Sequence, residues 1–232
     1  IGCGADANPE RDSRRAAEIA VLQGRQIADE VERLLQSGSR LEITAAPAAT
    51  YGFAGLPIDR PSVDDLRRSL EDKRPQVRKH AETMLATHAR MGRLPETYPM
   101  PIQVWRFGNQ FAMVFLGGEV CVDYAFRIRR ELLPKLAPPA AGSNAAAAND
   151  RAVHPVWVTA YANDVFGYVA PERMQDEGGY EVDFSMIYYL QPGRWSRGTE
   201  EVILRRGDEH FEEQGGGGAL PVNAAPRPFT PP

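Results

Sequence analysis

The sequence predicts an α/β fold in which helices are layered on a partial, mixed β-sheet. Three observations lead to this prediction. Apolar residues recur at helical spacing over residues 13–35, and apolar and polar residues alternate over 102–107 before a turn and a second apolar run at 111–116. The 232 residues are 43% hydrophobic and 9% aromatic, which is enough to bury a core. Strand, loop and helix in succession are the units of α/β proteins.

The chain opens with a Gly/Asp/Asn/Pro loop at residues 2–9 and continues into the long helix. Ile19, Ile27 and Val31 recur at helical spacing there, and Gly38 lies where a C-cap is expected. Ile1 has the character of a strand end, because a polar turn follows it at once. We therefore expect the chain to be part of a larger domain.

A polar helical hairpin is expected after an extended segment at 41–56. Ser62 and Asp65 have the spacing of a capping box, and Pro75 divides the region into two helices, the second ending near residues 91–92. Most faces of these helices are polar, so we expect a surface hairpin that covers the sheet. His80 and His88 lie on it and are expected to be solvated.

The strand pair over 102–116 is followed by the first candidate site residue. The run 111–116 has no alternation, which predicts a strand buried on both faces, and it stops at Gly117-Gly118-Glu119. A helical pattern begins at Val120. Glu119 is therefore expected at the carboxyl end of a buried strand, where α/β sheets bind ligands.

The remainder of the chain contains shorter elements and two irregular segments. We expect a strand at 153–161, a short helix at 171–176, a strand-like stretch at 180–189 and a short helix at 200–206. An Ala/Pro/Gly/Asn-rich segment at about 134–152 reads as a mobile insertion. Residues 214–232, rich in glycine and proline, read as a disordered tail.

Several classes of function are not favoured by the sequence. The net charge is −4, so a nucleic-acid partner is not expected, and no apolar run approaches the ~20 residues of a transmembrane helix. Cys3 and Cys121 could form a single disulfide or remain buried free thiols, and the sequence leaves both alternatives open. The chain contains no HExxH, Cys-x-x-Cys, Gly-x-Ser-x-Gly or phosphate-loop pattern.

Four motifs occur in one order along the chain: GCGADANP at residues 2–9, GGEV at 117–120, YANDVFGY at 161–168 and EGGYE at 177–181. In this order they resemble the C-terminal half of the catalytic domain of the neutral/alkaline ceramidases, and in particular the environmental-bacterial branch of that family. The resemblance implies that residues 1–213 are part of a zinc-hydrolase domain. It also implies that the intact protein hydrolyses an N-acyl bond, with ceramide or another lipid-like amide as substrate.

The resemblance also implies roles for single residues. Glu119 and Tyr168 match two ligands of one zinc ion, whose two histidine ligands are expected upstream of this chain. Tyr180, twelve residues after Tyr168, matches the tyrosine that contacts the reacting amide. Asn163 matches an asparagine of the same turn and is expected to contact substrate. The chemistry is coherent, since zinc lowers the pKa of bound water and a tyrosine hydroxyl stabilises an oxyanion.

One departure from the family pattern leaves alternatives open. Asp6 and Asn8 are expected to line the site, but Asn8 stands where the family has a serine, and an amide cannot act as a nucleophile. The alternatives are a relative that hydrolyses a different substrate, and a degenerate hydrolase domain without catalysis. The chain alone supplies two ligands, so we expect it to bind zinc weakly and to be inactive by itself.

Overall fold

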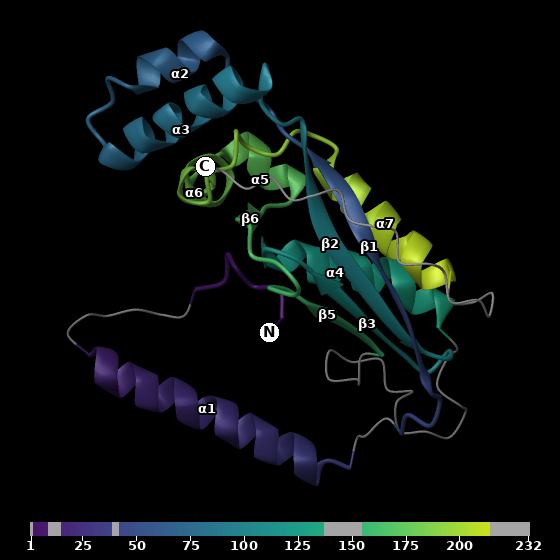
Figure 1. The fold of residues 1–232 in the computed structure, drawn as a ribbon. Helices are drawn as coiled ribbons and strands as arrows, with labels where there is room; N and C mark the ends of the chain where they lie inside the picture. The colour runs from purple at the N-terminus through teal and green to yellow at the C-terminus, as the bar shows by residue number, and fades with distance from the viewer. Residues whose placement is uncertain (1, 9–14, 39–41, 137–154, 214–232) are drawn as a thin grey trace.

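The protein was analysed as a computed structural model, which describes residues 2–8, 15–38, 42–136 and 155–213. The insertion expected at about 134–152 lies mostly outside these residues, and the tail expected at 214–232 lies wholly outside them. The helices and strands are shown in Figure 1 and have these bounds: α1 Ala16–Gln36, β1 Pro47–Pro57, α2 Val63–Ser69, α3 Pro75–Met91, β2 Thr97–Phe107, β3 Phe111–Leu116, β4 Glu119–Val120, α4 Val122–Leu132, the 3-10 turn η1 Leu133–Lys135, β5 Val156–Thr159, β6 Tyr168–Val169, α5 Glu172–Glu177, the π-helix η3 Tyr180–Phe184, α6 Ser185–Tyr188 and α7 Thr199–Glu213.

A four-stranded sheet in the order β1-β2-β3-β5 forms the framework. β1, β2 and β3 are antiparallel neighbours, whereas β5 pairs in parallel with β3, with Val114 opposite Val158. The sheet is therefore mixed, and the predicted α/β class is confirmed. The predicted hairpin is also confirmed, since β2 and β3 pair as its two strands and Phe107 lies opposite Phe111.

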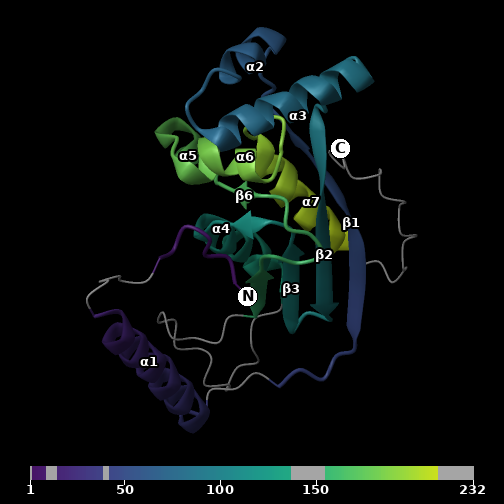
Figure 2. The ribbon, with the colours of Figure 1, turned by 60° about the vertical axis from the view of Figure 1, so that its left-hand side comes forward.

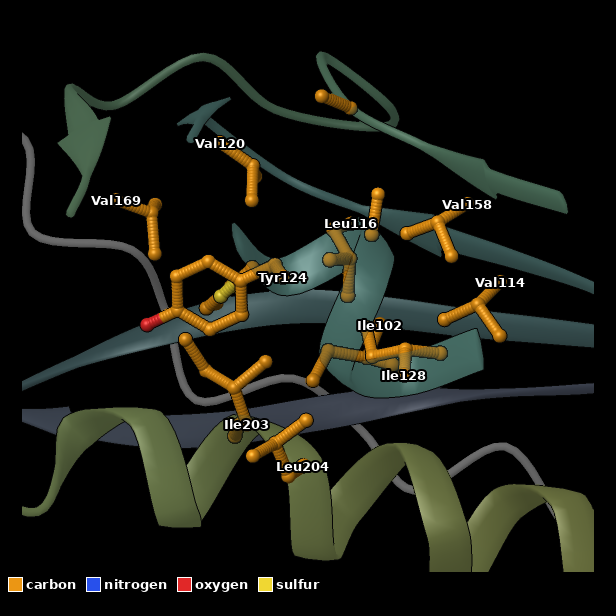
Figure 3. Close-up of a cluster of buried hydrophobic side chains, with 14 of the residues drawn as sticks. Ile102, Val114, Leu116, Val120, Tyr124, Ile128, Val158, Val169, Ile203 and Leu204 are labelled. Carbon is orange, nitrogen blue, oxygen red and sulfur yellow. The ribbon is translucent and has the colours of Figure 1, made fainter. Parts of the chain in front are cut away.

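One face of this sheet carries the main hydrophobic core. Because successive strand residues point to opposite faces, alternate residues of neighbouring strands form one apolar surface. Helices α4 and α7 cover that surface, and Figure 3 shows Tyr124 and Ile128 of α4 and Ile203 of α7 among the sheet side chains. Ile102 at the centre of β2 is fully buried. Burial of this apolar surface stabilises the fold.

The opposite face of the sheet is aromatic and only half covered among the described residues. Trp157 is 56% exposed and Trp105 is 37% exposed. The expectation that the strand at 111–116 is buried on both faces is therefore wrong: Met113 and Phe115 are half-buried. The continuous apolar run reflects packing among aromatic side chains, such as Trp105 with Phe115, on a face that no described helix covers.

The α2–α3 hairpin forms as predicted but lies elsewhere. The Ser62–Asp65 capping box is present, and Pro75 begins α3, which ends at the left-handed Gly92. The hairpin lies beyond one end of β1 and β2 and near α6, and does not cover the sheet (Figures 1 and 2). His80 is half-buried and hydrogen-bonds the Gln191 carbonyl oxygen at 2.7 Å, so the expectation that it is solvated is wrong.

The segment at 180–189 is helical, which corrects the predicted strand. It begins after Gly178 and Gly179, both at positive φ, and forms η3 followed by α6. Val182 and Met186, four residues apart, are both buried, which is the helical period; the Tyr- and Val-rich composition had suggested β structure instead. The final helix is also longer than expected, because Phe211 of α7 still packs into the core beyond residue 206.

The helix α1 is confirmed near its predicted bounds, but it buries no residue. In Figure 1 it stands apart from the rest of the protein. Its apolar side chains include Ile27, which is 67% exposed, and Leu35, which is 60% exposed. Among the described residues no helix combines the length and apolarity that a membrane span requires.

Candidate functional site

Glu119 and Tyr168, the two expected metal ligands, lie directly opposite each other. They are register partners in the parallel pair β4–β6, a second sheet of two strands. The Glu119 N–H donates to the Gly167 carbonyl oxygen at 2.8 Å, and the Gly118 N–H donates to the Asp164 carbonyl oxygen at 2.8 Å. The structure therefore brings together two residues that are far apart in the sequence. In Figure 2, β6 lies between α4 and the helices α5 and α6.

The turn before Glu119 requires glycine. Gly118 has φ +78°, and a Cβ at this position would lie 2.9 Å from the Gly167 carbonyl oxygen. A side chain there would be strained and would also press on the backbone of the partner strand. The close approach of the two strands places the side chain of Glu119 beside that of Tyr168.

The carboxylate of Glu119 is half-buried and accepts hydrogen bonds from tyrosines. The Tyr189 hydroxyl donates to Oε1, and the Tyr161 hydroxyl donates to Oε2 at 3.2 Å. Burial, and then the charge of Glu119 and a hydrogen bond to it, raise the pKa of Tyr168 to about 12. The pKa values of Tyr189 and Tyr161 are also raised, first by burial and then by Glu119. The phenols surrounding this carboxylate are therefore protonated near neutral pH.

Left-handed backbone conformations gather around the same carboxylate. Among the described residues, three residues other than glycine have positive φ: Tyr161 (58°), Asn163 (68°) and Leu190 (53°). Leu190 directly follows Tyr189. Asn163, the expected substrate contact, is exposed in the turn that follows Tyr161. Such conformations are uncommon outside glycine, and they concentrate at functional sites.

The loop that carries Asp6 and Asn8 lies against β4 and the start of α4. The Gly4 N–H donates to the Val120 carbonyl oxygen at 3.0 Å, and Asp6 Oδ1 accepts the Val122 N–H at 2.8 Å. Asp6 therefore caps α4, because Cys121 at the N-cap position makes no side-chain capping bond. Asn8 is exposed at the end of the described part of this loop.

The two cysteines near this loop are free thiols. Cys121 is fully buried, and Cys3 is partly buried against the main core. Burial raises the pKa of the Cys3 thiol to about 12 and raises that of Cys121 as well. A thiol with a raised pKa is a weak nucleophile near neutral pH, so these residues act as apolar packing groups.

Tyr180 extends the site into a cluster of aromatic rings. Its ring meets that of Tyr168 edge-on, with centroids 5.7 Å apart, and also contacts Phe184 and Tyr188. Tyr180 is 49% exposed and Tyr188 is 54% exposed. The guanidinium of Arg74 lies over the Phe184 ring at 5.0 Å. The π-helix η3 carries Tyr180 and Phe184, and α6, which continues it, carries Tyr188 four residues further on; π-helical turns are frequent at functional sites.

Two further hydrogen bonds brace the turn between Tyr161 and Tyr168. The Tyr98 hydroxyl on β2 donates to Asp164 Oδ2 at 2.6 Å, and Gln191 Nε2 donates to the Phe166 carbonyl oxygen at 2.9 Å. Tyr98 also stacks on Phe166 with ring centroids 4.4 Å apart. The turn is therefore fixed to the large sheet on one side and to the segment after Tyr189 on the other.

Sequence reasoning did not single out Tyr161 or Tyr189 as site residues. Tyr161 is the first residue of the motif YANDVFGY and the last residue of the predicted strand at 153–161. Its place at a strand end could have indicated that it lies near Glu119. Tyr189 had no such signal, because the bond to Glu119 spans 70 residues and depends on a helix that was predicted to be a strand.

The acidic groups of the described residues do not by themselves form a metal cluster. No group of three or more His, Cys, Asp or Glu side chains is placed there to hold an ion. Comparison of the chain with family models, curated proteins and solved structures gives no match. The fold and the site define an α/β protein with a tyrosine-surrounded carboxylate at the ends of two short parallel strands.

Proposed function

We propose that this chain forms part of the active site of a zinc-dependent hydrolase that cleaves N-acyl amide bonds. The observation that supports this most directly is the pairing of Glu119 with Tyr168 across β4 and β6. The same edge receives the Asp6 loop and the Tyr180 helix, so several segments of the chain converge there. Glu119 and Tyr168 begin β4 and β6, and they follow the parallel strands β3 and β5 in the chain; the carboxyl ends of parallel strands are where α/β folds bind ligands.

The donor atoms fit the proposed ion in part. A carboxylate oxygen and a phenol oxygen are hard ligands, and carboxylates are common in zinc sites. Glu119 and Tyr168 are two ligands, so further ligands would come from outside the described residues; the family resemblance places two histidines there, and a water molecule would be the fifth ligand. Zinc, when bound, would lower the pKa of a water molecule and polarise the amide carbonyl.

The residues of this chain would bind and orient the substrate. The Tyr180 hydroxyl would donate a hydrogen bond to the oxyanion of the tetrahedral intermediate. The exposed rings of Tyr180 and Tyr188 and the half-buried ring of Phe184 offer an apolar surface beside the site, which suits the hydrocarbon part of a lipid-like amide. Asp6 would hold the N-terminus of α4 next to the site, and Asn163 and Asn8 would offer amide groups for hydrogen bonds.

The test uses the full-length protein that contains this chain. We expect Glu119→Gln to lose bound zinc, measured by mass spectrometry of the metal, and to lose hydrolysis of a fluorescent N-acyl amide by about 10²-fold or more. Glu82→Gln, on the exposed face of α3, is the matched control and is expected to retain both. One zinc per protein in the Glu119→Gln variant would overturn the metal assignment.

Asn8 bears on the substrate. Because an asparagine amide cannot act as a nucleophile, we propose that the natural substrate is a lipid-like amide other than ceramide. Fatty-acid release from ceramide by the wild type and by Asn8→Ser separates these readings. Equal, rapid release by both proteins would make ceramide the substrate.

A second candidate function is a domain without catalysis. It is favoured by one observation, the lack of a three-residue His/Cys/Asp/Glu cluster among the described residues. Zinc analysis of the full-length wild type distinguishes the two candidates, because a non-catalytic domain would be isolated without stoichiometric zinc.

A further inference from the structure

Both oxygens of the Glu119 carboxylate are engaged by hydroxyl groups from different parts of the chain. Tyr189 donates to Oε1 from the end of α6, and Tyr161 donates to Oε2 from the segment after β5. Both bonds join residues that are far apart in the sequence, by 70 residues for Tyr189 and 42 for Tyr161. A carboxylate held through both oxygens by two tertiary contacts cannot rotate freely.

A left-handed backbone conformation occurs at Tyr161 and directly after Tyr189. Tyr161 itself has φ 58°, and Leu190, directly after Tyr189, has φ 53°. A left-handed residue other than glycine is strained, and it persists where the surrounding structure imposes it. The two donors to Glu119 thus lie at or next to strained positions, an observation independent of the hydrogen bonds themselves.

Other contacts fix the Tyr161 segment to the residue before Glu119, and the Tyr189 segment to the turn before Tyr168. The Tyr161 N–H donates to the carbonyl oxygen of Gly118, the residue before Glu119, at 3.0 Å. On the other side, the Gln191 N–H donates to the Met186 carbonyl oxygen at 3.0 Å, while its side chain holds the Phe166 carbonyl oxygen. The Gln191 side chain is buried, so this second support is shielded from water.

We propose that Tyr161 and Tyr189 are positioning residues that hold the Glu119 carboxylate in one orientation as a ligand. A carboxylate has about four lone-pair sites. Tyr161 and Tyr189 each occupy one, on different oxygens, and Tyr168 also hydrogen-bonds the carboxylate, so about one site remains for a cation. This inference rests on the proposed function for the identity of the cation, zinc, but the hold on the carboxylate does not depend on any metal.

The hold on the carboxylate is tested by NMR of the 232-residue chain with ¹³C at the carboxyl carbon of glutamate. The Glu119 resonance is the one that disappears in Glu119→Gln. We expect Tyr161→Phe and Tyr189→Phe, which remove only a hydroxyl, each to shift that resonance. Tyr51→Phe on β1 is the matched control and is expected to leave it in place. An unshifted Glu119 resonance in both site variants would overturn the proposal.

A melting curve of each variant separates a positioning role from a structural one. Tyr161→Phe and Tyr189→Phe act on different oxygens, so each tests the proposal by itself if the other does not fold. A folded variant with a shifted resonance supports the proposal. Folded variants whose resonance is unchanged show that the hydroxyls have no influence on Glu119.

Titration of the same samples with Zn²⁺ distinguishes this proposal from the function on which it rests. We expect Zn²⁺ to move the wild-type Glu119 resonance, and Tyr161→Phe or Tyr189→Phe to need roughly 10–100-fold more Zn²⁺ for the same change. Equal zinc dependence in all samples would overturn the positioning role. If Zn²⁺ leaves wild-type Glu119 unmoved, the chain alone does not bind the metal and zinc analysis of the full-length protein decides the metal assignment, while the shifts caused by the hydroxyl deletions still establish the hold.

Discussion

The four-stranded sheet and the two-stranded sheet lie in one structure but are stabilised in different ways. On the large sheet, the core face consists of apolar side chains covered by α4 and α7, and Ile102 and Val114 on it are fully buried. On the small sheet, Val120 and Val169 point into the same core (Figure 3), whereas their neighbours Glu119 and Tyr168 are half-buried and polar. The outer side of the small sheet is held by hydroxyl and backbone hydrogen bonds.

This difference separates stability from function in the molecule. Apolar burial contributes most of the free energy of folding, and it is concentrated on the large sheet. Around the small sheet lie left-handed residues, a close backbone approach at Gly118 and a carboxylate among phenols, features that do not favour folding by themselves. The large sheet, together with Val120 and Val169, provides the stability that allows these features to persist.

The largest expected effect is on the large sheet. Ile102→Ala removes a fully buried side chain between β1 and β3 and is expected to lower the free energy of unfolding by about 2–5 kcal/mol. Urea unfolding of the 232-residue chain, followed by circular dichroism, measures the change. A loss similar to that of an exposed substitution would contradict the assignment of the core to this face.

Substitution of Gly118 is expected to lower stability less than Ile102→Ala but to disturb the environment of Glu119 more. Gly118→Ala introduces a Cβ at φ +78° and 2.9 Å from the Gly167 carbonyl oxygen, which should cost about 1–3 kcal/mol. The strain falls on the β4–β6 pair, so the Glu119 carboxyl resonance should shift as well. Gly24→Ala on α1, where no atom lies within 4 Å of the new Cβ, is the control and should not destabilise the chain. A Gly118→Ala variant with wild-type stability and an unmoved Glu119 resonance would show that the two strands do not need this close approach.

The sequence predicted the large sheet better than the small one, for a physical reason. Alternation over β2, the turn at Gly108 and the capping box at Ser62 are local signals, and each was confirmed because local preference and tertiary packing agree there. The strand at 111–116 also ends where predicted, and Glu119 follows it as the first residue of β4. These features depend on residues that are close in the sequence.

The parts of the site that sequence reasoning missed depend on contacts between distant residues. The bond from Tyr189 to Glu119 needs the helical path of residues 180–188, and the composition of that segment favoured a strand. Asp6 was expected to line a catalytic site, and the structure places its carboxylate as a cap on α4, 116 residues away. Neither contact leaves a periodic pattern in the sequence.

Acid should destabilise the large sheet through His210. This side chain of α7 is 1% exposed against Gly52 of β1, and burial lowers its pKa, although Glu213 at 3.0 Å opposes that shift. Arg206 and Glu209 of the same helix are the other charged groups that act on it. A depressed pKa in the folded state means that stability is complete above the unfolded value of about 6.5 and is lost as the pH falls below it.

The measurement for His210 is the melting temperature of the chain between pH 7.5 and pH 5. We expect a lower melting temperature at pH 5, and a smaller drop in His210→Gln, whose side chain does not titrate. His88→Gln on α3 is the matched control and should keep the wild-type slope. An unchanged slope in His210→Gln would assign the acid sensitivity to other groups.

The smallest effect on stability is expected at Ile27 of α1, an amphipathic helix that covers no surface among the described residues. α1 and α7 both have an apolar side, but Ile203 of α7 is 1% exposed and Ile27 of α1 is 67% exposed. The same substitution, Ile→Ser, should therefore destabilise the chain strongly at residue 203 and by no more than about 0.5 kcal/mol at residue 27. Thermal unfolding of the two variants compares burial directly, because the chemistry of the change is identical. Similar losses of stability at both positions would mean that the apolar side of α1 is packed in solution. A loss of stability confined to residue 203 would show that an amphipathic pattern predicts a helix without specifying what that helix covers.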